Sequence, residues 1–362
     1  EARTLTGEMI AMDANDAGVG KLAFTLRVPL GVVGAISPFN FPLNLVAHKL
    51  APAIAAGCPV VLKPASQTPL TALLLAEVLL GEAGLPDGWL SVVTGGGASV
   101  GNALVEHPDV GMITFTGSPE VGWGIKALAP RKKVGLELGN NAPVIVEPDA
   151  DLELAATKIV AGGYAYSGQT CISVQRVYAH ESVADDLIAL ITRKVEALVV
   201  GDPLHDATDV TALISDSERD RVTGWIDEAL EAGAKLAVGG EVHDGVLTPT
   251  VLTGVTPDMK VCSQEVFGPL IGVQSYSSVD DALRLANESR YGLQAAVFTR
   301  DLATALRTAH SLDFGGVMIN EMPTYRTDQM PYGGVKDSGN TKEGPHYAVR
   351  EMTEERLVVI AL

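Results

Sequence analysis

Three side chains in this sequence have the chemistry of a nucleophile, a base and an oxyanion donor. Cys171 lies in SGQTCIS, whose small residues let a reagent approach the thiol. A thiolate is a strong nucleophile, although a lone cysteine is more commonly a buried structural residue. Glu137 ends the apolar segment VGLE, where a carboxylate can act as a base or be simply solvated. Asn40 lies in SPFNFP between two prolines, and such a fixed amide can stabilise an oxyanion or form a turn.

A second group of residues has features of a phosphate or cofactor site. The segment FTGSPEVG, residues 115–122, follows a strand-like pattern and begins a helical one. Its GxxxxG spacing is a weaker signal than the dinucleotide fingerprint GxGxxG. A glycine turn between a strand and a helix still suits an anion, because the first N–H groups of a helix lack partners. Lys63 ends the strand-like VVLK and would place a cation at the same edge, unless it is solvated.

Short apolar strands alternate with helical patterns along most of the chain. The first series begins near residue 44 and the second near Ala142. This alternation predicts an α/β fold with two doubly wound parallel sheets, one in each of two domains. Residues 24–36 and the terminal RLVVIAL are strand-like but lie outside both series. A bare terminal strand needs a partner, so it is either an edge strand or an arm between subunits.

Composition narrows the class of protein. The 362 residues are 47% hydrophobic and carry a formal net charge of −18, which favours a folded globular chain and disfavours nucleic-acid binding. Three cysteines are too few for a disulfide framework and suggest a reducing, cytoplasmic compartment. The opening EARTLTGEMI lacks the pattern of a signal peptide, and polar or proline residues interrupt every long apolar stretch. We therefore expect no membrane association, and no metal site is predicted.

Taken together, SPFNFP, VLKPASQTP, FTGS, LELG, GQTC and EVFGP resemble the NAD(P)-dependent, non-acylating aldehyde dehydrogenases. The resemblance runs from about residue 24 to the C-terminus and includes NESRYGL, GGVMIN and PYGGVKDSG. It implies that Cys171 is the nucleophile, Glu137 the general base and Asn40 the oxyanion amide. The implied reaction oxidises an aldehyde to its acid through a thiohemiacetal and a thioester, which water activated by Glu137 then hydrolyses.

The same resemblance implies contacts to NAD or NADP. Lys63 is similar to the lysine that binds the adenosine ribose, and Glu265 to the carboxylate that holds the nicotinamide ribose. Many NAD-preferring members carry glutamate where this chain has Ser66, and serine removes the repulsion of a 2′-phosphate. We therefore expect NADP to be accepted. The implied cofactor contacts are Pro38, Phe39, Lys63, Ser66, Gly97, Gly101, Gly117, Ser118, Glu265 and Phe267.

The substrate is a small aldehyde in this reading. The loop INEMPTYRTDQMPYGG, residues 319–334, resembles the branch that acts on lactaldehyde, glyceraldehyde-type and succinate-semialdehyde-type substrates. Arg326 in this loop could bind a carboxylate or phosphate, or form a structural ion pair. Thr170 stands where enzymes for strongly anionic aldehydes often have arginine. A small hydroxylated or carboxylated aldehyde is expected. Asn140 stands where glycine is usual, and no role is assigned to it.

The resemblance also implies a domain plan and self-association. It predicts a cofactor domain over residues 1–139, with an oligomerisation hairpin at about 20–32, a catalytic domain over 140–340, and a C-terminal return with an oligomerisation strand over 341–362. Only 39 residues precede Asn40, so the cofactor domain is expected to be incomplete at its N-terminus. A dimer or tetramer is expected. The alternatives are a CoA-acylating enzyme, disfavoured by Glu137, and a non-catalytic protein of the same fold, disfavoured by the intact catalytic set.

Overall fold

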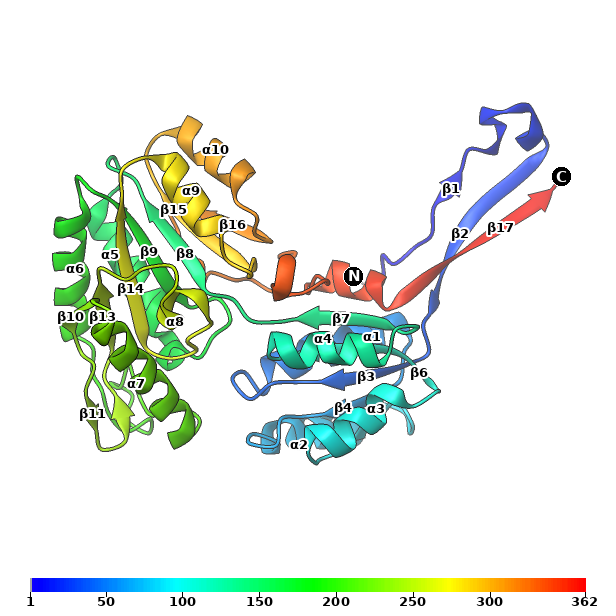
Figure 1. Ribbon diagram of the computed structural model, residues 1–362. Coiled ribbons are helices and arrows are strands. Elements are labelled where there is room, and N and C mark those ends of the chain that lie inside the picture. Colours follow the sequence, from blue (N-terminus) through cyan, green and yellow to red (C-terminus); the bar gives the residue numbers. More distant parts are fainter. Residues whose placement is uncertain (1) are drawn as a thin grey trace. The chain divides into compact units, whose positions relative to one another are not determined.

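The chain divides into two compact units in a computed structural model, which describes residues 2–362 (Figure 1). Unit 1 holds the described residues up to Glu137, together with Thr327–Tyr332 and Asn340–Leu362. Unit 2 holds Leu138–Arg326 and Gly333–Gly339. No helix within residues 2–362 is long and apolar enough to cross a membrane.

Unit 1 is built on a five-stranded parallel sheet of order β5-β4-β3-β6-β7. Apolar side chains of its strands pack with those of α1, α2 and α11 in a buried core. The α1 helix ends where Gly57 takes a left-handed φ of 83°, a conformation that glycine adopts without strain. The elements are β3 (Val32–Ile36), α1 (Asn44–Ala56), β4 (Val60–Lys63), α2 (Leu70–Glu77), β5 (Leu90–Val92), α3 (Asn102–Glu106), β6 (Val110–Thr116), α4 (Pro119–Leu128), β7 (Lys133–Glu137) and α11 (Pro345–Glu351).

The strand order of unit 1 has a topological switch at its centre. The chain runs from β3 outward to β4 and β5, and then returns to the other side of β3 for β6 and β7. In open α/β sheets, ligands bind beyond the carboxyl ends of the strands at such a switch. The loops after β3 and β6 therefore flank the expected binding crevice of this sheet.

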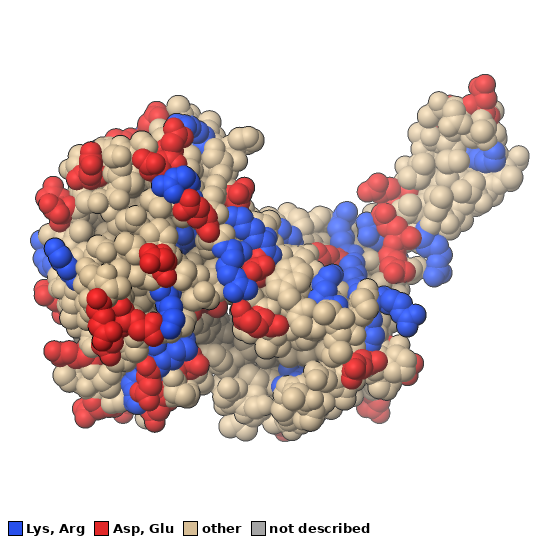
Figure 2. Space-filling model, in the orientation of Figure 1, with Lys and Arg blue, Asp and Glu red and all other residues tan. Residues whose placement is uncertain are grey.

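A separate antiparallel sheet forms an arm of unit 1. It contains β1 (Met9–Ile10), β2 (Lys21–Pro29) and β17 (Thr353–Ala361), with β2 in the middle. The terminal strand thus pairs with β2 and with neither large sheet. The expectation that all of residues 24–36 lie outside the alternating series was wrong, because β3 is the central strand of the parallel sheet. Figure 2 shows mostly uncharged side chains over the outer part of this arm.

Unit 2 contains a seven-stranded sheet of order β10-β13-β14-β9-β8-β15-β16. Six strands are parallel, and β10 runs antiparallel to β13. The predicted α/β class is confirmed, but this second sheet is mixed rather than wholly parallel. Its strands are β8 (Ala142–Val146), β9 (Val174–His180), β10 (Lys235–Val238), β13 (Thr250–Thr253), β14 (Leu270–Tyr276), β15 (Gln294–Phe298) and β16 (Gly316–Ile319), with a small hairpin of β11 (Val242–His243) and β12 (Val246–Leu247).

Helices pack against this sheet and complete its core. Asp151 caps the first of them by accepting a hydrogen bond from the N–H of Leu154. The helices are α5 (Leu152–Tyr164), α6 (Ala184–Glu196), α7 (Asp216–Glu231), α8 (Lys260–Ser263), α9 (Val279–Asn287) and α10 (Leu302–Ser311). Short 3₁₀ or π turns cover Met12–Ala14, Asp16–Gly18, Val78–Glu82, Gly97–Gly101, Ala165–Gly168 and Lys336–Ser338.

Candidate active site

Four predicted site residues of unit 1 lie at the carboxyl edge of its parallel sheet. Lys63 is the last residue of β4 and Glu137 the last of β7. Asn40 lies in the loop after β3, and Ser118 follows β6 by two residues. Because the strands are parallel and paired in register, their ends meet at one edge. The fold therefore gathers these residues where α/β sheets place their ligands.

The loop that carries Asn40 is tied to the neighbouring connection. Asn40 is buried, with 3% of its surface exposed. The N–H of Ser37 donates to the carbonyl of Lys63 at 3.2 Å, and the Thr68 hydroxyl donates to the carbonyl of Phe39 at 3.3 Å. These bonds at Ser37 and Phe39 restrict the backbone on which the Asn40 amide stands. A restricted amide is what an oxyanion donor requires.

Lys63, Ser66 and Gly101 lie in one region of unit 1. Lys63 is 5% exposed, its ammonium donates to the carbonyl of Pro64 at 3.1 Å, and burial lowers its pKa. A Cβ added to Gly101 would lie 3.8 Å from Lys63 Cδ, so the glycine lies against this side chain. Ser66 is exposed and donates to the carbonyl of Gly95 at 3.0 Å. A buried cation beside an exposed hydroxyl offers an anion a place to bind.

An open groove lies along α4 and reaches α3. Its volume is about 490 Å³, and the exposed apolar side chains of Val121 and Leu128 line it. Ser118 caps α4 by accepting a hydrogen bond from the N–H of Val121. A Cβ at Gly117 would lie 2.5 Å from the Phe115 ring, so the turn into the helix requires glycine. This groove could receive a flat apolar ring beside a helix N-terminus.

Glu137 is buried on a sheet face that also receives a cation, Lys49, which the sequence pattern did not single out. Glu137 is in register with Thr116 on β6, so both side chains lie on the same face of the sheet. Lys49 of α1 reaches that face, because its ammonium lies 2.6 Å from the Thr116 hydroxyl and 3.4 Å from that of Thr114. It also forms a buried ion pair with Glu343, at 3.6 Å. The signal that could have found Lys49 is a charged residue within an otherwise apolar helical pattern.

A second lysine approaches Glu137 from the segment that follows Gly339. Asn340 fixes this segment along β7 through three hydrogen bonds with the backbone of Val134 and Leu136. Burial lowers the pKa of Lys342, and the negative charges of Glu137 and Glu351 oppose that shift. Glu137 thus lies in an environment with compensating positive charge.

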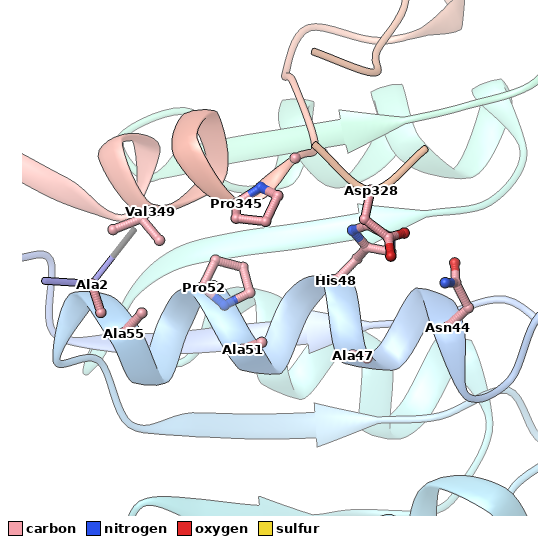
Figure 3. A pocket seen from close by; sticks show the side chains of 11 residues that line it. Ala2, Asn44, Ala47, His48, Ala51, Pro52, Ala55, Asp328, Pro345 and Val349 are labelled. Atoms are coloured by element: carbon pink, nitrogen blue, oxygen red, sulfur yellow. The ribbon is translucent and has the colours of Figure 1, made fainter. Parts of the chain in front are cut away.

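A second cavity of unit 1 holds none of the predicted site residues. It lies between α1 and α11 and has a volume of about 360 Å³ (Figure 3). His48 Nε2 lies 3.3 Å from a carboxylate oxygen of Asp328 at one end of it, and alanine and proline side chains line much of the rest. No cysteine among the described residues lines this cavity, so it offers no thiol nucleophile.

The nucleophile candidate of unit 2 follows a strained turn. Tyr166 and Ser167 both have a left-handed φ of 56°, and Gly168 follows with a φ of 73°. A Cβ at Gly168 would lie 2.1 Å from the carbonyl oxygen of Gly268, so no other residue fits there. Strained backbone of this kind is concentrated at functional sites. The turn delivers the chain to Cys171 in a conformation that the surrounding structure fixes.

Cys171 differs from the other two cysteines in exposure. Cys171 is half-buried, whereas Cys58 and Cys262 are buried. Burial raises the pKa of the Cys58 thiol and raises that of Cys262 to about 11. A thiol that stays protonated is a poor nucleophile. Cys171 is therefore the thiol that a small reagent can reach.

The remaining predicted residues of unit 2 lie close to the Cys171 segment. Thr170, Glu265 and Phe267 line one small cavity, and the Thr170 hydroxyl is buried without a hydrogen-bond partner among residues 2–362. The Thr324 hydroxyl bonds the carbonyl of Ile172 at 3.1 Å and that of Gly162 at 3.0 Å. The bond to Ile172 ties the loop that carries Arg326 to the residue after Cys171. Sequence reasoning identified that loop but missed Thr324 as its anchor.

Each unit thus contains a coherent part of the predicted site. Unit 1 gathers the amide, the carboxylate and the lysine at one sheet edge, and unit 2 gathers the thiol, Thr170, Glu265 and Phe267 around one turn. The residues with no predicted role that support these groups are Lys49, Glu343 and Lys342 in unit 1, and Asn140, Asn141, Gln175 and Thr324 in unit 2.

Known proteins resemble this chain in sequence and in fold. The model of the aldehyde dehydrogenase family matches residues 1–358. A 3-sulfolactaldehyde dehydrogenase of Priestia aryabhattai is 50% identical over 362 residues, which cover 100% of this chain and 76% of that protein. A lactaldehyde dehydrogenase of Methanococcus maripaludis is 41% identical over 99% of this chain and 76% of that protein. The solved NADP-dependent glyceraldehyde-3-phosphate dehydrogenase of Bacillus halodurans, complexed with NADP, is 44% identical, with a TM-score of 0.97 over 100% of this chain and 76% of that chain.

Proposed function

This chain belongs to the aldehyde dehydrogenase family, and we propose that it oxidises a small aldehyde with an anionic group to the carboxylic acid, with NADP⁺ or NAD⁺ as the oxidant. The observation that carries this proposal is Cys171, a reachable thiol on a strained turn in a chain whose other two thiols are buried. A thiol so placed suits covalent catalysis on a carbonyl group.

In the proposed reaction, the Cys171 thiolate adds to the aldehyde carbon and forms a thiohemiacetal. The Asn40 amide and the N–H of Cys171 donate to the resulting oxyanion, which lowers the barrier to its formation. The bound dinucleotide supplies a hydride acceptor, and loss of hydride from the thiohemiacetal carbon leaves a thioester on Cys171. Glu137 then takes a proton from water, the hydroxide attacks the thioester carbon, and the acid leaves as the Cys171–carbon bond breaks.

Unit 1 is proposed to bind the dinucleotide. The groove at α4 suits the adenine ring, and the N-terminus of α4 at Ser118 suits a phosphate. Lys63 would contact the adenosine ribose. The other proposed dinucleotide contacts of this unit are Pro38, Phe39, Gly97, Gly101 and Gly117. Ser66 carries no charge, so a 2′-phosphate meets Lys63 without repulsion from a carboxylate at this position. Glu265 and Phe267 of unit 2 would contact the nicotinamide end.

The substrate is proposed to carry a negative charge. Two of the similar proteins are named for 3-sulfolactaldehyde and glyceraldehyde-3-phosphate, whose sulfonate and phosphate are anions. In this chain, Arg326 lies two residues from Thr324, which bonds the residue after Cys171. Arg326 would therefore bind the anionic end of the aldehyde. Thr170, next to Cys171, is smaller than the arginine that enzymes for strongly anionic aldehydes often have at this position, so it leaves space beside the thiol.

We also propose that the arm mediates self-association into a dimer or tetramer. Leu357, Val359 and Ile360 of β17 are between 42% and 59% exposed, and Leu26 of β2 is 44% exposed. Apolar strands of this kind are stabilised by pairing or packing with another chain. Sedimentation of the wild-type protein and of a variant lacking residues 353–362 tests this role.

A panel of aldehydes, each with NADP⁺ and NAD⁺, tests the proposed function. We expect reduced dinucleotide and free acid to form in equal amounts without coenzyme A, fastest with 3-carbon aldehydes that carry a sulfonate, phosphate or carboxylate. A strict requirement for coenzyme A would favour the acylating alternative, and the absence of any dinucleotide reduction would refute the proposal.

A further inference from the structure

Asn140 has no part in the reaction described above. Its carboxamide and its backbone N–H are nevertheless both hydrogen-bonded to other segments of unit 2. The residue is 2% exposed. Its carboxamide donates to the carbonyl of Gln294 at 3.1 Å and accepts from the N–H of Leu293 at 3.4 Å, both at the beginning of β15. Its own N–H donates to the Glu265 carboxylate at 2.9 Å. The side chain therefore fixes the orientation of the peptide group that bonds Glu265.

The Glu265 carboxylate lies directly on the Gly139–Asn140 segment. A Cβ added to Gly139 would lie only 2.3 Å from Glu265 Oε2, while Oε1 accepts the Asn140 N–H. Both carboxylate oxygens are thus placed by this short segment. An N–H bond to a charged carboxylate is among the stronger hydrogen bonds in proteins.

The backbone that carries Glu265 is held by different residues. Gln175 of β9 donates to the carbonyls of Val261 and Gln264 at 2.9 and 2.6 Å and accepts from the N–H of Val266 at 3.0 Å. Asn141 adds a bond to the carbonyl of Cys262 at 2.7 Å. Removal of the Asn140 carboxamide should therefore loosen the peptide group that bonds the carboxylate without releasing the loop.

We propose that Asn140 is a positioning residue that holds the Glu265 carboxylate in the orientation that accepts the hydroxyl groups of the nicotinamide ribose. This proposal rests on the proposed function, since it assumes that Glu265 meets the dinucleotide. Its physical basis is preorganisation: a carboxylate already held in place loses less conformational freedom on binding. The adenosine end of the dinucleotide, which unit 1 is proposed to bind, does not depend on Asn140.

The test compares two probes on variants without the carboxamide. Titration calorimetry measures the Kd of NADP⁺ and of adenosine 2′,5′-bisphosphate, which has the adenosine end alone. For Asn140→Gly and Asn140→Ala we expect the Kd of NADP⁺ to rise by about three- to tenfold, which corresponds to one hydrogen bond between uncharged groups, because the backbone N–H that bonds Glu265 stays and only the side-chain bonds that fix it are lost. The Kd of the bisphosphate should stay unchanged.

Asn287→Ala provides a matched control in the same unit. The Asn287 carboxamide also bridges two backbone groups, donating to the carbonyl of Ser311 and accepting from the N–H of Asp313. We expect this variant to lower Tm as the Asn140 variants do, while both Kd values stay at the wild-type level. A merely structural role for Asn140 would give the same pattern as Asn287.

Three results would overturn the proposal: an unchanged Kd for NADP⁺ in both Asn140 variants, an equal rise for both probes, or a rise as large in Asn287→Ala. A wild-type protein that binds neither probe would instead refute the proposed cofactor, and with it the premise about Glu265.

Discussion

A change of Ser66 to glutamate should reduce the use of NADP⁺ without harming that of NAD⁺. Ser66 is exposed at the edge of the region that holds the buried Lys63 ammonium, and its hydroxyl donates to the carbonyl of Gly95. A carboxylate placed there would face the 2′-phosphate that Lys63 is proposed to bind. Because the site is open to solvent, the interaction between these charges is that of a water-like medium rather than a protein interior.

The size of the expected loss with NADP⁺ follows from Coulomb's law. Two unit charges about 5 Å apart in water repel by about 0.8 kcal/mol, and a phosphate carries a charge of about −1.5 to −2. The repulsion is therefore about 1 to 2 kcal/mol, equivalent to a loss of about 5- to 30-fold in kcat/KM for NADP⁺. At high ionic strength the loss should shrink, because exposed charges are screened.

The assay is the ratio of kcat/KM for NADP⁺ to that for NAD⁺ in the wild type, Ser66→Glu and Ser66→Gln. The glutamine variant has the size of glutamate without its charge, so it separates repulsion from bulk. We expect the ratio to fall in Ser66→Glu and to stay near the wild-type value in Ser66→Gln. Equal ratios in the two variants would refute the reasoning that charge at this position selects the dinucleotide.

Two further predictions concern buried groups. Lys49→Met removes the cation from a buried ion pair with Glu343, and the loss of one partner of such a pair typically costs about 3–5 kcal/mol. The Tm of unit 1 should therefore fall by on the order of 10 °C. Lys126→Met, at an exposed lysine, is the control, and equal Tm values for the two variants would contradict the burial argument. Burial raises the pKa of Cys262 from 9.0 to about 11, so the folded state holds this proton more tightly, and stability is present below pH 9 and lost as the pH rises towards 11. Urea unfolding should show a loss of about 2–3 kcal/mol over that range which is absent in Cys262→Ala, and parallel curves for the two proteins would contradict it.

The sequence was informative where local pattern determines structure. The alternation of strand and helix patterns predicted the α/β class of both units. The sequence did not predict that β3 is the central strand of the sheet. That position depends on its pairing with β4 and β6, which the composition of the β3 segment does not reveal. The pairing of β17 with β2 is likewise a contact between the two ends of the chain.

The supporting residues of the site were harder to predict than the reactive ones. Cys171 and Glu137 were singled out because their types and neighbours suggest chemistry. Asn140 and Gln175 act through backbone groups of loops that are distant in sequence, so their types carry no signal until the fold is known. Lys49 shows the intermediate case, since its charge in an apolar helix was visible but its partners on β6 were not. The catalytic roles of Cys171, Glu137 and Asn40 remain predictions.

The central claim is that the aldehyde becomes a thioester of Cys171. Acid quenching of the enzyme during turnover, followed by digestion and mass spectrometry of the Cys171 peptide, tests it most directly. We expect an acyl adduct on Cys171 that accumulates in Glu137→Gln, where hydrolysis is slowed. In Cys171→Ser we expect both the adduct and the activity to be absent. Full activity in Cys171→Ser, or an adduct on Cys58 or Cys262 instead, would contradict it.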